Sequence, residues 1–464
     1  MPRKTIATYA VGSLGTGGFA TLPGLVLVYY LTDSLGIAAL GAGFIVTLAK
    51  VWDVIIDPVI GARSDRSLAV TGSRFRFMVL GASTLPVFFV LTFAVPGGLN
   101  PVAAGVWVFV AFVLTSTSFS LFQVPYIALP AELTAGYDQR TRLLSVRVVV
   151  LTIAILLFGA GGPALRELGG TNEYAGYLLM AVVAGIVIGG GMLYSSRVAP
   201  RLPRGQRPPV PRGGHSAVAS LGANYRAGVA TLRRSAPFRA LLGTFLLQAL
   251  ATGLMLADAQ YIATWVLKSQ DAVTLLFVAL IAPAVICAPV WAGIARRVGK
   301  ERAFVAATVL FGVAALSMVA LIWAPGPWVY LPVALAGAGY AGLQSLPMSM
   351  LPDVIAHDAR SNGNGAAGTF GGVWTAGETT GMAFGGTILT IVLAATGYLT
   401  STGSQVVMQG PSAISGIVLS FSVLPAVIMA VSLISLARYP LRKTDIDSGL
   451  PGSAGDNPSE RVAS

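Results

Sequence analysis

Long apolar runs recur along almost the whole chain, and they limit its fold more than any other feature of the sequence. Twelve runs can be counted, and each is long enough to cross the roughly 30 Å hydrocarbon core of a bilayer as a helix. They lie at about residues 8–32, 39–62, 77–97, 103–129, 145–164, 174–195, 239–266, 272–295, 303–323, 328–351, 366–396 and 412–437. Because a backbone in hydrocarbon must satisfy its own hydrogen bonds, the runs predict an all-α membrane protein with twelve transmembrane helices.

The composition supports a membrane protein. Of the 464 residues, 55% are hydrophobic and only 10% are charged, whereas a soluble domain carries about 25% charged residues. The formal net charge of +12 is spread over short loops, so we expect no nucleic-acid partner. The single cysteine, Cys287, and the distant histidines His215 and His357 predict neither an intramolecular disulfide nor a metal site. The expected partners are the lipid bilayer and a small-molecule substrate.

Basic residues gather in every second loop, which sets the expected orientation. Only Arg166 and Lys268 lie on the opposite side. Since loops rich in Lys and Arg stay in the cytoplasm, an even number of helices places both termini there. The segment Met1–Lys4 leads into the first apolar run without a visible cleavage site, so we expect that helix to be retained.

The spacing of the runs divides the chain into two halves of six helices. The predicted segments are an N-terminal half at 1–196, a Pro- and Arg-rich cytoplasmic loop at 197–238, a C-terminal half at 239–437 and a disordered tail at 438–464. A basic hairpin at 61–66 is echoed weakly at 292–302. Two matching six-helix halves are typical of the major facilitator fold, in which the binding site lies between the halves near mid-membrane.

Three ionisable residues inside the second run are the strongest functional signal. Lys50, Asp53 and Asp57 are spaced by three and four residues, so they lie on one face of a helix. Each charge at that depth costs on the order of 2.5–3.5 kcal/mol, and two carboxylates one turn apart resist ionising together. The pattern favours a proton- or cation-binding site. The alternative is a structural Lys–Asp pair that locks two helices together.

Several segments occur in an order that can be compared with known families. The most specific is Ala49–Arg66, AKVWDVIIDPVIGARSDR. The others are Tyr29–Asp33 (YYLTD), Gln123–Thr134 (QVPYIALPAELT), Tyr137–Leu143 (YDQRTRL) continuing to Arg147, and Met350–Asp358 (MLPDVIAHD) with the Gly-rich run to Gly381. Together they resemble the glycoside–pentoside–hexuronide:cation symporter family, the melibiose-permease-like branch of the major facilitators. The resemblance covers nearly all of the transmembrane chain and implies a transporter of the bacterial cytoplasmic membrane.

The resemblance implies roles for particular residues. Asp53 and Asp57 match the family's two cation-site carboxylates, and Ser120 stands where a hydroxyl of the fourth helix joins them. Lys50 takes the place of a basic residue that is usual there. Arg147 matches an arginine that supports the substrate site.

Five positions depart from the family pattern or sit beside a departure. Ile56 replaces an asparagine of sodium-using members, which removes an oxygen ligand and favours a proton over Na⁺ at Asp53 and Asp57. Gly17 and Gln123 stand where the melibiose branch carries acidic residues, and Thr379, beside Glu378, stands where it carries a lysine. The implied substrate site, which includes Gln123 and Thr379, is therefore more neutral than a melibiose site. An amphipathic lysophospholipid is an alternative substrate.

Four further residues are candidate substrate contacts. Tyr126 and Trp374 offer ring faces to a sugar or an apolar ligand, although ordinary helix packing explains either ring as well. Asp258 is a candidate for a substrate-contacting or proton-carrying acid, and the alternative is a helix-capping or interface role near the outer end. Glu378 either lines the cavity or pairs with Lys50 across the halves.

Charged residues of the cytoplasmic hairpins are candidates for a gate. They are Asp65, Arg66, Glu132, Arg140, Arg142, Asp353 and Asp358. A surface pair contributes about 1 kcal/mol or less, but several pairs that close the cytoplasmic side would favour an outward-facing state. The alternative is that these charges only set the topology.

The predicted function is secondary transport, a proton- or sodium-coupled symport of a sugar- or glycoside-like solute by a monomer without a cofactor. The alternatives are a transporter of lysophospholipid or another amphipathic solute, an antiporting exporter, and a receptor or scaffold without transport. The sequence contains no HExxH, P-loop or GxSxG motif, so an enzyme is not expected.

Overall fold

The computed structural model describes residues 2–134, 137–170, 172–203, 207, 229–269, 271–362, 367–402 and 407–441. Most of the predicted central loop and the tail beyond residue 441 lie outside these residues. The described chain is almost entirely helical, with one isolated antiparallel bridge between Leu35 and Thr402.

The helices follow the order of the apolar runs. The first half comprises α1 (Arg3–Val11), α2 (Ser13–Tyr29), the π-helical turn η1 (Tyr30–Ser34), α3 (Ala39–Thr71), α4 (Phe75–Phe93), α5 (Pro101–Leu133), α6 (Tyr137–Glu167) and α7 (Glu173–Ser196). The second half comprises α9 (Ala236–Tyr261), the π-helical turn η3 (Ile262–Val266), α10 (Ala272–Val298), α11 (Lys300–Ser317), the 3₁₀ turns η4 (Met318–Ile322) and η5 (Pro327–Val329), α12 (Tyr330–Asn362), α13 (Ala367–Ala395), α14 (Pro411–Phe421) and α15 (Val423–Ala437).

The number of spans agrees with the twelve that the sequence predicts. Eleven helical segments of the described residues are long and apolar enough to cross a membrane. The remaining long helix, α12, has 33 residues and covers the tenth predicted run. Some helices are longer than their apolar runs. The helix α3 continues nine residues past its run because nothing interrupts it until Gly72, whose φ of +80° ends the helix.

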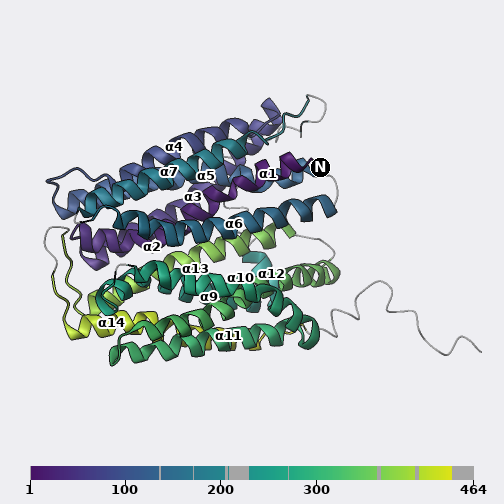
Figure 1. The fold of residues 1–464 in the computed structure, drawn as a ribbon. Coiled ribbons are helices and arrows are strands. Elements are labelled where there is room, and N and C mark those ends of the chain that lie inside the picture. The colour runs from purple at the N-terminus through teal and green to yellow at the C-terminus, as the bar shows by residue number, and fades with distance from the viewer. Residues whose placement is uncertain are drawn as a thin grey trace, which may run out of the picture.

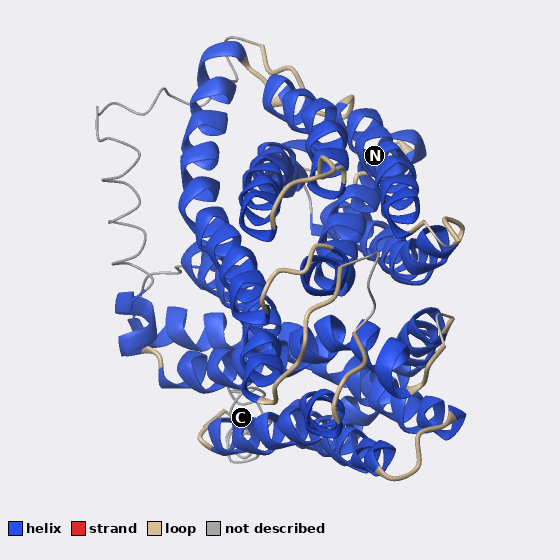
Figure 2. Cartoon of the chain, turned by 90° about the vertical axis from the view of Figure 1, so that its left-hand side faces the viewer, coloured by secondary structure: helices blue, strands red, loops and turns tan. Residues whose placement is uncertain are grey.

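The two halves lie side by side, with α1–α7 in the upper part of Figure 1 and α9–α15 in the lower part. Figure 2 views the same two groups from one end of the bundle. The halves meet where α3 contacts α13, α6 contacts α10 and α2 contacts α9. Within the second half, two glycines allow α9 and α13 to approach closely. A Cβ on Gly253 of α9 would collide with the backbone of Met382, and a Cβ on Gly385 of α13 would collide with the backbone of Leu254.

Hydrogen bonds join the halves at the end of the bundle away from the N-terminus. The hydroxyl of Thr32 in η1 lies 2.6 Å from the hydroxyl of Tyr261 in α9. Tyr398 donates to Asp33 Oδ1 at 2.6 Å and accepts from Trp265 Nε1 at 2.8 Å. We call these five side chains the latch. All five are buried, so water does not compete for their hydrogen bonds.

The latch hydrogen bonds converge on one carboxyl group. Thr32 donates to Asp33 Oδ2 at 2.6 Å, so its contact with Tyr261 requires the Tyr261 hydroxyl to donate. The main chain adds a hydrogen bond from Ser401 N to Thr32 O at 3.1 Å. The latch thus connects the first helix of one half to the first helix and the last inter-helix loop of the other. The opposite end of the bundle carries the N-terminus and the basic loops, and we call it the basic end.

The bridge between Leu35 and Thr402 gives a direct test of this arrangement. Facing residues of an antiparallel pair have Cα atoms about 4.5–5.5 Å apart, a separation that a disulfide spans. In a Cys287→Ala background, the Leu35→Cys/Thr402→Cys double variant should form a cross-link under mild oxidation. Both thiols should then resist maleimide mass-tagging in denaturant until a reductant is added. The Leu35→Cys single variant is the control, and full tagging of the oxidised double variant would contradict the bridge.

Candidate functional site

The charged face of α3 is close to the contact between the halves. Lys50 Nζ lies 3.2 Å from Asp53 Oδ2, and these side chains are 29% and 13% exposed. Lys50 also lies over the ring of Phe19 in α2, 5.9 Å from its centroid. Such an internal pair lowers the cost of two charges at this depth. The helix continues through Pro58 without a break, so Asp57 stays on the same face.

A hydroxyl of the neighbouring helix completes the group of oxygens. Ser120 of α5 is buried, and its side chain interacts with the Asp57 carboxyl. The Oδ1 atoms of Asp53 and Asp57 are buried without a hydrogen-bond partner among the described residues. An unpaired carboxylate oxygen in this setting is a place for a proton or a cation. We call Lys50, Asp53, Asp57 and Ser120 the α3 cluster.

The residues present fit a proton more readily than a sodium ion. A proton needs only one carboxylate oxygen, whereas a hard cation is held by several oxygens. Ile56 offers none, and the Lys50 ammonium already supplies a positive charge beside Asp53.

Three predicted substrate contacts of the first half are already engaged with other side chains of that half. The guanidinium of Arg147 lies 5.3 Å from the centroid of the Tyr126 ring. Tyr126 is fully buried, stacks on Tyr9 with centroids 4.6 Å apart and donates to the Tyr9 carbonyl at 2.8 Å. Gln123 Oε1 accepts from the Thr16 hydroxyl at 2.8 Å. The ring of Tyr126 is therefore used for packing in this conformation, and it positions Arg147.

Two predicted contacts of the second half are packed inside that half. Trp374 is 2% exposed and stacks on Phe245 with centroids 4.3 Å apart. Asp258 is fully buried and accepts from the Ser420 hydroxyl of α14 at 2.7 Å. Neither side chain offers a free face to a solute here. The sequence shows that these residues lie in membrane helices, but not which way each helix is turned.

A cavity between the halves is lined by residues of both α3 and α13. Its lining residues are Thr47, Lys50, Val51 and Val54 from α3 and Thr379, Thr380, Ala383 and Phe384 from α13. The hydroxyls of Thr47 and Thr387 are 2.5 Å apart across the halves. Lys50 and Thr379 thus line one cavity, and their contact with a substrate stays a prediction. Lys50 pairs with Asp53 rather than with Glu378.

The four acidic candidate gate residues form ion pairs, none of which joins the two six-helix halves. The pairs are Arg74–Asp65, Arg74–Glu132, Arg234–Asp358 and Lys300–Asp353, with N···O distances of 2.6, 2.5, 2.6 and 2.6 Å. Arg66 and Arg142 are exposed, and the side chain of Arg140 lies outside the described residues. Bridges between the halves in another conformation stay a prediction.

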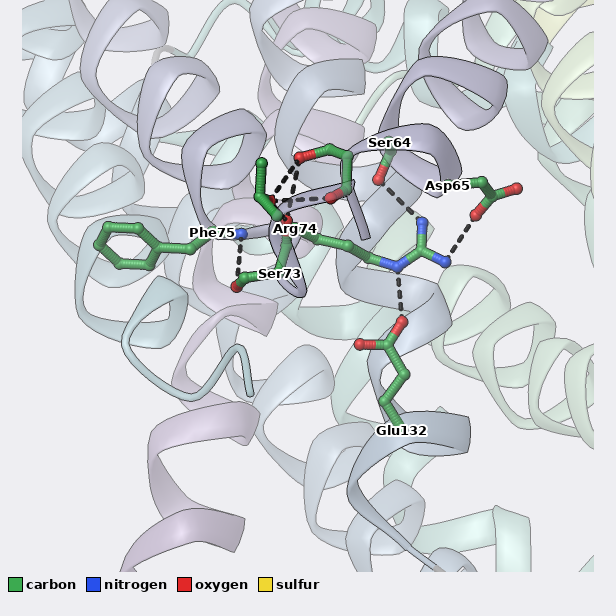
Figure 3. A network of polar contacts seen from close by, with 8 residues as sticks. Ser64, Asp65, Ser73, Arg74, Phe75 and Glu132 are labelled. Atoms are coloured by element: carbon green, nitrogen blue, oxygen red, sulfur yellow. Dashed lines mark hydrogen bonds and ion pairs between the residues drawn. The ribbon is translucent and has the colours of Figure 1, made fainter. Parts of the chain in front are cut away.

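The sequence analysis missed the central residue of this network, Arg74. Figure 3 shows its guanidinium between Ser64, Asp65 and Glu132, with the Ser64 hydroxyl accepting at 2.8 Å. Burial by itself would lower the pKa of Arg74, but hydrogen bonds to Glu132 and Asp65 outweigh burial and raise that pKa above its ordinary value. The available signal was its place directly before α4, shortly after Asp65 in the sequence.

Comparisons with known proteins agree with this geometry. A family model described as MFS/sugar transport protein matches residues 8–443. The chain is 25% identical over 447 residues to the glucuronide carrier protein homolog of Escherichia coli (strain K12), covering 94% of this chain and 92% of that protein. It is 24% identical over 389 residues to the sodium-dependent lysophosphatidylcholine symporter 1 of Mus musculus, covering 75% of this chain and 69% of that protein.

A solved structure shares the fold. The crystal structure of a bacterial homolog of the human lysosomal transporter Spinster, in an inward-facing and unoccupied conformation, matches with a TM-score of 0.66 at 12% identity. The match covers 94% of both chains. At this identity the match demonstrates the major facilitator fold alone.

Removing the Arg74 guanidinium should destabilise the protein. An Arg74→Gln variant leaves the Glu132 carboxylate, whose side chain is 11% exposed, without its cation, which typically costs about 3 kcal/mol. The Tm of the purified variant in lipid nanodiscs should fall clearly. Arg66→Gln, a change at an exposed position of the same basic end, should leave Tm almost unchanged. Equal Tm values for the two variants would contradict the assigned role of Arg74.

Proposed function

We propose that this chain, which belongs to the MFS/sugar transport protein family, is a symporter that couples uptake of a sugar- or glycoside-like solute to a proton. Its family and its structural relatives are membrane transporters, so the chain is a transporter rather than an enzyme. The observation that carries the proposal is the α3 cluster at the contact between the halves. There, two buried carboxylate oxygens that have no hydrogen-bond partner in the described part of the chain lie beside Lys50.

The proposed cycle uses the charge of the cluster. With Asp53 and Asp57 both ionised, one Lys50 ammonium leaves a net negative charge next to the cavity. Binding one proton removes that charge, which lowers the cost of closing the site around a solute and moving it through the membrane. Because the loaded and empty clusters differ by one charge, proton and solute binding favour each other, which is the requirement for coupled transport.

The direction of access follows from the latch. If both termini are cytoplasmic, as the basic loops predict, then the latch is on the outer side and this conformation faces inward. Outward opening then requires the latch hydrogen bonds to break and the basic end to close, with Asp65, Glu132, Asp353 and Asp358 exchanging partners between the halves. We propose that one monomer, with halves at 1–196 and 239–437, performs the cycle.

A second candidate substrate is a lysophospholipid. The cavity between the halves has an apolar side formed by Val51, Val54, Ala383 and Phe384, which suits an acyl chain. The Mus musculus relative reported above is named a sodium-dependent lysophosphatidylcholine symporter. Lys50 could then face the phosphate of the headgroup.

Ligand-induced thermal stabilisation tests the two candidates. The purified protein in nanodiscs is heated with p-nitrophenyl β-D-glucuronide, melibiose or lysophosphatidylcholine, at acidic and alkaline pH, with and without Na⁺. We expect a glycoside to raise Tm more at acidic pH and independently of Na⁺. Stabilisation by lysophosphatidylcholine alone would replace the sugar proposal, stabilisation only with Na⁺ would replace the proton, and no stabilisation by any glycoside would contradict the sugar proposal.

Neutral variants of the cluster should uncouple transport. In proteoliposomes with an imposed proton gradient, Asp53→Asn and Asp57→Asn should lose accumulation of the glycoside that stabilises the wild type, because the amide cannot change charge. The internal concentration should not exceed the external one. Asp271→Asn, an exposed carboxylate before α10, is the control and should accumulate normally. Accumulation by either cluster variant would contradict the assignment.

A further inference from the structure

A second polar cavity lies inside the C-terminal half, apart from the α3 cluster. It has room for about one water molecule and lies between α9, α12 and α13. Its polar lining residues are Gln248 and Thr252 from α9, Tyr340 and Gln344 from α12, and Glu378 from α13. Among the residues that line it, Glu378 is the only one with a charge, and none is basic.

The hydrogen bonds of Gln248 fix the direction of its amide. Gln248 is 2% exposed, and its Nε2 donates to the hydroxyls of Thr308 at 3.0 Å and Ser432 at 3.4 Å. Those hydroxyls donate their own protons to the carbonyls of Phe304 at 2.8 Å and Met429 at 2.7 Å. They can therefore only accept from Gln248, so a flipped amide would place oxygen against oxygen.

The fixed amide leaves an acceptor on the cavity side. Gln248 Oε1 is buried and has no hydrogen-bond partner among the described residues. A buried acceptor in this position costs stability unless a donor reaches it. On α12, Gln344 Nε2 donates one of its two protons to the Tyr340 hydroxyl at 2.7 Å, and among the described residues neither side chain hydrogen-bonds Gln248 Oε1.

We propose that this cavity is a proton-binding site, in which Glu378 binds a proton and Gln248 Oε1 accepts the hydrogen bond of the resulting acid, directly or through one water. A hydronium ion gives its proton to a Glu378 oxygen, which forms the carboxyl O–H and leaves a water molecule. The step changes the charge of Glu378 from −1 to 0 and provides the donor that Gln248 Oε1 lacks. This proposal does not depend on which solute the protein carries, so it can be tested without a transport measurement.

The groups around Glu378 are consistent with a single titrating acid. From α12, the Tyr340 hydroxyl faces it, and α9 contributes only neutral groups to the cavity. From α3, Lys50 lines the neighbouring cavity with Thr379, but its ammonium is paired with Asp53. The helix α14, which also contacts α13, carries no ionisable side chain. Each half of the molecule would then hold its own proton-binding carboxyl near the path of the solute.

Infrared spectroscopy of the full-length protein in nanodiscs tests the proposal. The carbonyl stretch of protonated carboxyl groups is followed as pH is varied in the Asp53→Asn/Asp57→Asn background, which removes the α3 cluster. We expect a titrating band that Glu378→Gln removes, while the bands of the other carboxyl groups, among them the buried Asp33 and Asp258, remain. If the band and its titration survive in Glu378→Gln, the proposal is wrong. If Na⁺ or Li⁺ removes the band at constant pH, an alkali cation displaces the proton from the same carboxylate, and a site that is specific for the proton is ruled out.

A matched pair of variants on α9 tests the role of Gln248 without changing the acid. Gln248→Met removes the acceptor for the protonated acid and the oxygen that repels the ionised acid. The titration midpoint should therefore fall by about one pH unit. Gln260→Met, which changes another buried glutamine of α9 whose amide bonds Thr264, should leave the midpoint in place. An unchanged or raised midpoint in Gln248→Met would overturn the proposal, even if Glu378→Gln fails to fold.

Discussion

An ionised side chain inside hydrocarbon has to be neutralised within a few ångströms, because no solvent is there to do it. The ion pairs of the first half join residues of that half alone. Lys50 pairs with Asp53 within one helix, and Arg74 joins Asp65 and Glu132 within the first half. Because no charge in these groups depends on the opposite half, the halves can separate at the basic end without leaving a buried ion unpaired. Pairing charges within one half therefore lowers the free-energy cost of moving the halves relative to each other.

The latch joins the halves by hydrogen bonds rather than by ion pairs, and this also allows the halves to separate. Its contacts between the halves are hydrogen bonds from tyrosine hydroxyls to Thr32 and Asp33, and such a bond contributes only about 0.5–1.5 kcal/mol, or somewhat more to a charged group. A few of them hold one conformation without fixing it permanently. Binding of a proton or a solute changes free energy by a similar amount, so either can shift the balance between the two states.

The sequence predicts the spans and the α3 cluster because both depend on local spacing. Apolar length defines each helix, and three or four residues between charges place them on one face wherever the helix goes. The sequence does not predict that the side chains of Asp258 and Trp374 point into the second half, because the rotation of a helix about its axis depends on the helices packed against it. The partners of Asp33 could not be predicted either, since Tyr398 lies 365 residues away and belongs to a loop.

The π-helical turns η1 and η3 end the first helix of each half, and their residues correspond one to one. Tyr29 and Thr32 match Tyr261 and Thr264, so the Tyr261–Thr32 hydrogen bond has a counterpart in the side-chain interaction of Tyr29 with Thr264. The next position holds Asp33 in one half and Trp265 in the other, and both bond the same Tyr398 hydroxyl. The halves therefore meet at the latch as the subunits of a twofold-symmetric dimer would. At that one position the symmetry is broken into an acceptor and a donor, which gives the shared tyrosine hydroxyl a single orientation.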